Sequence, residues 1–207
     1  TTPVLAGMLI LGAIGATPLL RKTCRPQTGG ITWMLAGVSL VVVGLDFAEA
    51  MTPPGDADSL AYHFALPKKY LNYGGIEFVP RIISAASPQL VQMTYIPALA
   101  LGGERAMTLW TLISGLAAGG LLYALCRDYL GQAWSLAVAL VFLTLPAVVY
   151  GAGTGQIEIR TALFVMVAAF AAGRALESGR VAYVVLAGLA IGFFVASKYL
   201  GLFAALA

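Results

Sequence analysis

Long apolar runs alternate with short polar segments along almost the whole chain. Five runs approach the roughly 20 residues that a helix needs to cross a bilayer, at 4–20, 31–50, 106–126, 133–150 and 159–175. A sixth run, 181–196, is shorter but uninterrupted. This pattern predicts an all-α polytopic membrane protein with about six transmembrane helices.

The long polar segment 51–105 interrupts the pattern and contains one further apolar piece, PQLVQMTYIPALALGG at 88–103. Prolines and glutamines interrupt this piece and it is short for a span, so we interpret it as a re-entrant or interface-lying helix. The alternative is a crossing, which would invert every later loop. Residues 60–70 alternate apolar and polar side chains up to Pro67, and predict a short helix on the membrane surface with Lys68 and Lys69 near headgroups.

With 88–103 not crossing, the polar segments fall into two groups. Segments 21–25, 127–131 and 173–180 share one side, and segments 51–105, 151–160 and 197–199 share the other. Short loops of the first group carry more Lys and Arg, which favours the cytoplasm for that side. Residues 1–207 then form a single transmembrane domain, and 51–105 is its first extracytoplasmic loop with amphipathic helices.

Composition narrows the class of protein. With 60% hydrophobic and 10% charged residues, the chain has more apolar surface than a soluble core can bury, so lipid surrounds much of it. Its net charge of +3 is scattered, which argues against a nucleic-acid surface. Cys24 and Cys126 each lie near arginine and predict unpaired cytoplasmic thiols. The chain begins at Thr1 and stops within an apolar run, so we expect the N-terminal part of a longer polypeptide.

The stretch DADSLAYHFALPKKYLNYG, at 56–74, concentrates polar chemistry in this apolar chain. In the topology above, Asp56, Asp58, Glu158 and Lys198 all reach the same face of the membrane. Charged groups near membrane depth are costly and usually face a cavity or a partner. We therefore expect these four residues to converge on a site at the outer interface.

Several strings occur in a recognisable order: PPGDADSLAYHFALPKKYLNYGGIEFVP, SPQLVQMTYIPALALGG, ERAMTLWTLISGLAAGGLLYALCRDYLG, GTGQIEIRTALFVMVAAFAAGRAL and LAGLAIGFFVASKYLGL. Over residues 31–207 they resemble the N-terminal half of GT-C glycosyltransferases of the dolichyl-phosphate-mannose-protein mannosyltransferase-like group. That group includes protein O-mannosyltransferases and the lipid A aminoarabinose transferase. The resemblance implies a multi-pass enzyme of the bacterial inner (plasma) membrane. It would move a sugar from a polyprenyl-phosphate donor to a lipid, glycan or protein hydroxyl at the outer face.

The resemblance also implies roles for single residues. Asp58 matches the acid of the first outer loop that serves as catalytic base, and a carboxylate suits this role because it can accept a hydroxyl proton. Glu158 matches a second acidic position with an orienting or metal-binding role. Asp56 is a further candidate for the orienting role. The expected cations for the donor phosphate are Lys198, Arg81 and Lys69.

Two departures from the family pattern limit how many of these roles can be assigned to this chain. Many relatives have an Asp-Glu pair where this chain has Asp58-Ser59, and an acidic-Lys-Pro-Pro string where it has Ala-Ser-Pro-Gln at 86–89. The metal ligand and the phosphate-binding lysine of those strings are absent. The cofactor therefore stays unassigned, with the need for a divalent metal left open, and the phosphate must find cations elsewhere.

Structural roles are the alternatives for the acidic and imidazole side chains. Asp58 could cap the helix that follows it, and Asp56 could begin a turn. His63 is the only histidine, which favours a hydrogen-bonded interfacial residue over a metal ligand.

The later charged and aromatic residues also have alternative roles. Glu158 and Arg160 could neutralise each other, and Lys198 could snorkel from the end of its helix. The residues interpreted as aromatic-belt anchors are Tyr70, Tyr73, Tyr95 and Trp110.

Two other classes of function remain open. The first is a non-catalytic accessory or structural membrane subunit with a degenerate GT-C fold, bound to other membrane subunits. The second is a transporter with a midplane site, which we disfavour because the spans carry few interior charges.

Overall fold

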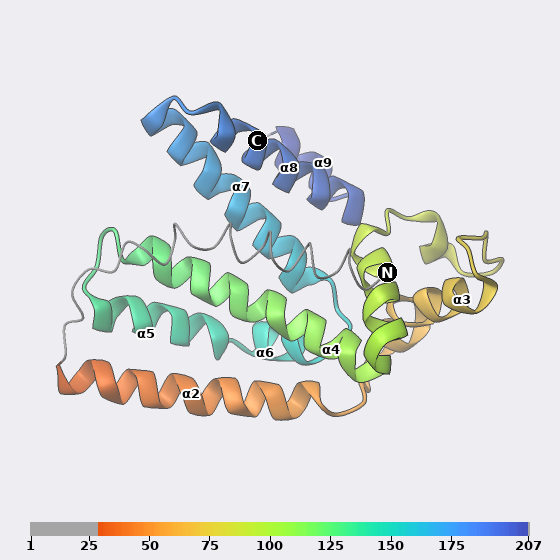
Figure 1. Ribbon diagram of the computed structural model, residues 1–207, viewed down its shortest axis with the longest axis horizontal. Coiled ribbons are helices and arrows are strands. Elements are labelled where there is room, and N and C mark those ends of the chain that lie inside the picture. The colour runs from red at the N-terminus through yellow and green to blue at the C-terminus, as the bar shows by residue number, and fades with distance from the viewer. Residues whose placement is uncertain (1–28, 207) are drawn as a thin grey trace.

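The computed structural model describes residues 29–206, where every regular element is a helix (Figure 1). The elements are α2 (Gly30–Ala50), η1 (Ser59–His63), α3 (Ala65–Tyr73), η2 (Ile83–Ala86), α4 (Leu90–Cys126), α5 (Gln132–Leu143), α6 (Pro146–Gly153), α7 (Glu158–Ser178), α8 (Val181–Ser197) and α9 (Gly201–Leu206). The predicted all-α membrane fold is confirmed.

Three of these helices, α2, α4 and α7, are long and apolar enough to cross a membrane, and the bent pair α5 and α6 adds a fourth if it forms one span. Helix α8 is shorter, and the predicted span 4–20 lies outside the described residues. The predicted count of six spans is therefore not confirmed.

The predicted span 133–150 is broken in the structure. Helices α5 and α6 meet at 66°, because Pro146 begins α6 and Leu145 before it is extended (φ −61°, ψ 131°). A residue that precedes proline avoids the helical conformation.

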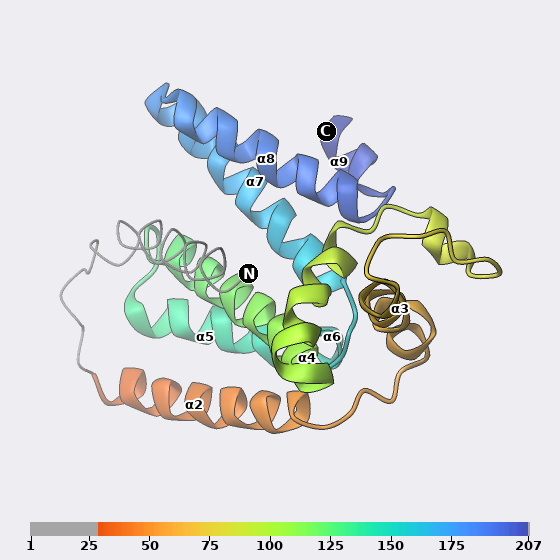
Figure 2. The same cartoon turned by 45° about the vertical axis from the view of Figure 1, so that its right-hand side comes forward.

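Helix α4 also changes direction, at Gly103 (φ 70°, ψ −161°). Only glycine adopts this backbone conformation without strain. Residues 104–126, at about 1.5 Å per residue, extend roughly 34 Å and can cross a bilayer core of about 30 Å. Residues 90–102 reach only roughly 20 Å by the same rule. Figures 1 and 2 show the two halves pointing in different directions.

The segment 51–105 begins and ends at the same end of the helical bundle. Thr108 Oγ1 in the second half of α4 donates a hydrogen bond to Ala50 O at the end of α2 (2.5 Å). Figures 1 and 2 place the α6–α7 turn and the C-terminal end of α8 toward this end, while the α4–α5 and α7–α8 connections lie away from it. We call the end with residues 51–105, 154–158 and 197–199 the loop end. This arrangement is the one expected if 88–103 does not cross.

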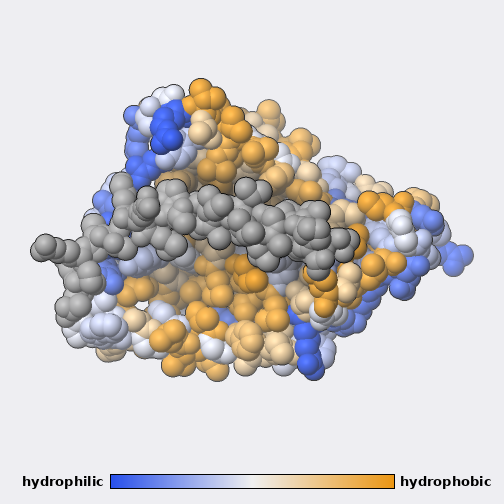
Figure 3. Space-filling view, viewed as in Figure 1, coloured by the Kyte–Doolittle hydropathy of each residue, from blue (hydrophilic) through white to orange (hydrophobic). Residues whose placement is uncertain are grey.

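The predicted surface helix at 60–70 is instead packed inside the loop end. Phe64, Leu66 and Tyr70 are buried, and the last two pack with Val79. Pro67 does not interrupt the helix, because it lies in the first turn of α3, where a missing N–H costs nothing. Apolar residues are prominent on the visible side of the helical bundle in Figure 3.

Candidate functional site

Two segments far apart in sequence are joined at the loop end. Asp56 Oδ1 accepts hydrogen bonds from the Ser59 N–H (2.8 Å) and from Gln156 Nε2 (3.0 Å). The Gly155 N–H donates to Ser59 Oγ (2.8 Å), and the Tyr95 hydroxyl donates to Gly155 O (2.9 Å). The turn before α7 is thereby fixed against η1, which places the predicted acids of both segments near one another.

A buried apolar cluster lies beneath this junction. Its residues are Phe64, Val91, Tyr95, Met107 and Ile157. They come from the residue that follows η1, both halves of α4 and the turn before α7. Gly155 is required in this turn, because a Cβ at that position would lie 2.5 Å from the Phe64 ring.

Asp58 lies exposed at the beginning of η1, and its side chain makes no capping hydrogen bond. The cap is provided by Asp56, which is buried. The capping role considered for Asp58 is therefore wrong, and the turn role considered for Asp56 is confirmed. The second oxygen of Asp56, Oδ2, is buried without a partner in the described part of the chain.

Glu158 forms an ion pair with Lys198 (Oε1 to Nζ, 2.5 Å), and both side chains are partly exposed. The pair joins the first residue of α7 to the residue after α8. The mutual neutralisation considered for Glu158 and Arg160 is wrong, because each has other partners. Lys198 does not simply snorkel, since a carboxylate holds its ammonium group.

Tyr62 lies near the predicted acids. Burial raises the pKa of this phenol, and the negative charges of Asp58, Glu158 and Asp56 raise it further. The half-buried ring of Tyr62 therefore lies within the field of all three predicted carboxylates.

His63 lies behind Tyr62, with ring centroids 4.1 Å apart. It is only 1% exposed. Its Nδ1 lies 3.1 Å from Gln92 Nε2, and its Nε2 has no partner among residues 29–206. Burial lowers the pKa of His63 to about 4 against the opposing effect of the three carboxylates, while Lys198 lowers it further. His63 is thus hydrogen-bonded as expected, but it is an interior and neutral residue rather than an interfacial one.

Within the described residues, no ion pair links the other predicted cations to this cluster. Lys69 is half-buried on α3, and Arg81 is exposed in the loop with φ 69°. Neither has an ion pair within residues 29–206. The neighbouring Lys68 forms its ion pair with Glu104.

Arg160 was not identified from the sequence as a buried residue next to the candidate site. It is 4% exposed. Its guanidinium donates to Ser114 Oγ (2.8 Å), Thr94 Oγ1 (3.0 Å) and Trp110 O (2.8 Å). The rings of Tyr95 and Trp110 lie 5.2 Å and 5.3 Å from it. An arginine just inside an apolar run was the available signal, because such a charge needs interior partners.

The predicted aromatic belt is wrong for two of its members. Tyr95 and Tyr70 are buried and donate hydrogen bonds to Gly155 O and Gln89 Oε1. Tyr73 is exposed, as an anchor would be.

A family model described as dolichyl-phosphate-mannose-protein mannosyltransferase matches residues 92–207. The chain belongs to this family. The match confirms the resemblance seen in the sequence and identifies a membrane glycosyltransferase of the GT-C type. It covers Glu158, Arg160 and Lys198, whereas Asp56 and Asp58 precede it. No curated protein and no solved structure matches the chain.

The metal-binding role that the family resemblance suggested for Glu158 has no ligand set here. Within residues 29–206 no three side chains of His, Cys, Asp or Glu are grouped so that they could hold a metal ion. Glu158 instead binds Lys198. We therefore derive no step of the mannosyltransferase-family chemistry through a metal.

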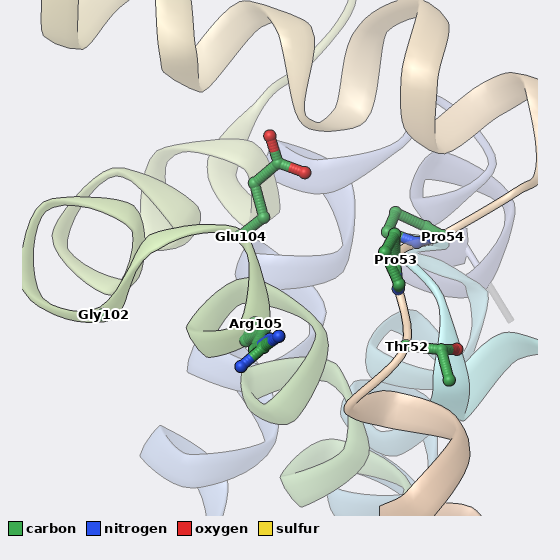
Figure 4. A pocket seen from close by; sticks show the side chains of 6 residues that line it. All are labelled: Thr52, Pro53, Pro54, Gly102, Glu104 and Arg105. Atoms are coloured by element: carbon green, nitrogen blue, oxygen red, sulfur yellow. The ribbon is translucent and has the colours of Figure 1, made fainter.

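Two hollows lie elsewhere at the loop end. One of about 330 Å³ (Figure 4) has residues 52–54 as one wall and residues from 102–105 as the other. A second of about 510 Å³ includes Tyr70, Phe78, Leu90, Met93 and Ala196 among its lining residues. The predicted acids and Lys198 line neither hollow.

Proposed function

We propose that the chain transfers a sugar from a polyprenyl-phosphate donor to a hydroxyl of a lipid, glycan or protein at the outer face of a bacterial inner membrane. One observation carries this proposal. Hydrogen bonds from Gly155 and Gln156 to Ser59 and Asp56 join the loop that carries Asp58 to the turn before Glu158, and Glu158 forms an ion pair with Lys198. Family membership supports the reaction class, and this convergence supports the place of the site.

Asp58 is the general base of the proposed reaction. Its exposed carboxylate, free of hydrogen bonds within the described residues, accepts the proton of the acceptor hydroxyl. The hydroxyl oxygen then forms a bond to the sugar C1 while the bond from C1 to the phosphate oxygen breaks. The electron pair leaves with the phosphate, which takes on negative charge. Lys198, held by Glu158, supplies positive charge for this leaving group.

A second candidate is an accessory membrane subunit without catalysis, and the charge balance at the cluster favours it. The cluster holds the carboxylates of Asp56, Asp58 and Glu158, and within residues 29–206 the one ion pair to these carboxylates comes from Lys198. Surplus negative charge repels a phosphate. An active enzyme therefore needs a further cation, which the bound acceptor or another segment would supply.

The substitution Asp58→Asn tests the proposal in the full chain reconstituted in lipid with a labelled polyprenyl-phosphate sugar. We expect transfer to fall by at least about 100-fold, since general-base catalysis contributes this much. The free energy of unfolding should change by less than about 0.5 kcal/mol, because the side chain is exposed.

Asp56→Ala is the matched control, because it removes the buried cap and should cost about 1 kcal/mol of stability. Transfer that persists in Asp58→Asn contradicts the assignment of the base. A wild-type chain that binds the donor but transfers nothing supports the accessory subunit.

A further inference from the structure

Arg160 carries a buried positive charge that no carboxylate within residues 29–206 balances through an ion pair. Its donors are used instead by two hydroxyls and one carbonyl, and two aromatic rings lie nearby. A buried charge is costly unless its hydrogen-bonding groups are satisfied. A planar guanidinium suits this place because it presents several donors in a fixed fork and also stacks on aromatic rings.

The groups around Arg160 come from both sides of the bend in α4. Thr94 and Tyr95 precede Gly103, whereas Trp110 and Ser114 follow it. Two further hydrogen bonds join the same halves, from Trp110 Nε1 to Thr94 Oγ1 and between the Tyr95 and Thr111 hydroxyls, both 2.9 Å. Helical hydrogen bonding is interrupted at Gly103, so side-chain links such as these fix the angle between the halves.

Arg160 itself lies in the first turn of α7, two residues after Glu158. The guanidinium therefore ties the beginning of α7 to the bend of α4. Glu158 emerges from this same turn and holds Lys198. The position of the ion pair thus depends on a buried anchor that contacts neither of its members.

We propose that Arg160 is a positioning residue of the site, which holds the Glu158–Lys198 pair in place by clamping the first turn of α7 across the bend of α4. This inference rests on the proposed function, in which Lys198 meets the donor phosphate. Arg160→Lys keeps the charge but lacks the planar fork, so it cannot serve all three oxygen acceptors at once. Small displacements of a positioned group have large kinetic effects. The KM for the donor should therefore rise about tenfold, while kcat falls less than about threefold.

The first test needs no catalysis. Glu158→Cys and Lys198→Cys are introduced into a full-length chain without Cys24 and Cys126, in lipid, and joined with a short bifunctional thiol reagent. Adding Arg160→Lys should lower the cross-linking yield at least about threefold. An unchanged yield overturns the proposal. If the yield falls but the protein transfers no sugar, the positioning role of Arg160 is supported and only the proposed reaction is contradicted.

The matched control is Arg174→Lys, on the same helix but at its exposed far end, where the arginine pairs with Asp128 and Glu177. It should leave both the yield and the donor KM unchanged. If the Arg160→Lys protein does not accumulate, Ser114→Ala can be used instead. It removes one of the three acceptors of the Arg160 guanidinium and should also lower the cross-linking yield. An unchanged yield in that variant also overturns the proposal.

The second test separates positioning from general stability. If Arg160 acts through Glu158, the donor KM of the double variant Arg160→Lys, Glu158→Gln should match that of Glu158→Gln alone. Losses that multiply in the double variant would show that Arg160 only stabilises the fold, and would overturn the proposal.

Discussion

Asp56 and Asp58 lie two positions apart but have different surroundings. Asp56 is buried and its Oδ1 accepts two hydrogen bonds, whereas Asp58 is exposed and accepts none in the described part of the chain. A substrate hydroxyl can reach only a carboxylate at the surface. The division of roles between these aspartates therefore follows from their burial, with one fixing the loop and the other free to take a proton.

His63 makes the stability of the loop end depend on pH. Its pKa is about 4 in the folded chain, against an ordinary value of 6.5. The unfolded chain therefore binds more protons between these values, and the free energy of unfolding falls as pH drops through this window. The contribution is complete above about pH 6.5 and amounts to at most about 3 kcal/mol. His63→Gln should flatten the pH dependence measured by denaturant unfolding. Equal slopes in variant and wild type would contradict this origin.

The sequence did not reveal which aspartate turns inward. The answer depends on Gln156, which lies 100 positions from its partner Asp56. The partners of Arg160 are likewise 46, 50 and 66 positions away. Local pattern carries no information about such contacts. Topology was enough, however, to expect Asp58, Glu158 and Lys198 at one end.

At the scale of elements, the turn before α7 depends on the absence of a side chain at Gly155. A Cβ there would lie 2.5 Å from Phe64 Cε1 and 2.8 Å from Ser59 Oγ. Both neighbours are buried, so they cannot move away freely. Gly155→Ala should therefore cost about 1–3 kcal/mol in the free energy of unfolding.

Gly120→Ala is the control for this measurement, because a Cβ at Gly120 in α4 meets nothing within 4 Å. It should be neutral or stabilise by up to about 1 kcal/mol. A similar loss in both variants would show that η1 is not packed against this turn.

Helices were predictable where apolar runs were long and uninterrupted. The expected runs 31–50, 159–175 and 181–196 correspond to α2, α7 and α8. The separation of 88–103 from the span 106–126 matches the bend at Gly103. The bend at Pro146 was less evident, because average hydropathy continues across it while its effect is on backbone conformation. The π-helix η1 was not predictable, since its backbone geometry depends on the turn that docks against it.

At the scale of the whole molecule, the loop end predicts a labelling pattern. In sealed vesicles that contain a chain without Cys24 and Cys126, single cysteines at Glu77 and Lys198 should react with a membrane-impermeant maleimide from the same side. A cysteine at Asp128, in the α4–α5 connection, should react from the other side. Labelling of Glu77 and Lys198 positions from opposite sides would show that the segment 88–103 crosses the membrane.

The break between α5 and α6 has a consequence for where this part of the chain can reside. A carbonyl that loses its helical partner is normally unsuitable for contact with hydrocarbon. Here the Thr144 hydroxyl bonds back to Leu140 O (2.9 Å) and Val141 O (3.1 Å), and the Leu145 N–H bonds to Phe142 O (3.2 Å). These three carbonyls of the last turn of α5 are therefore covered from within. The corner therefore leaves fewer carbonyls to be satisfied by water or a neighbouring protein than a bare chain break would.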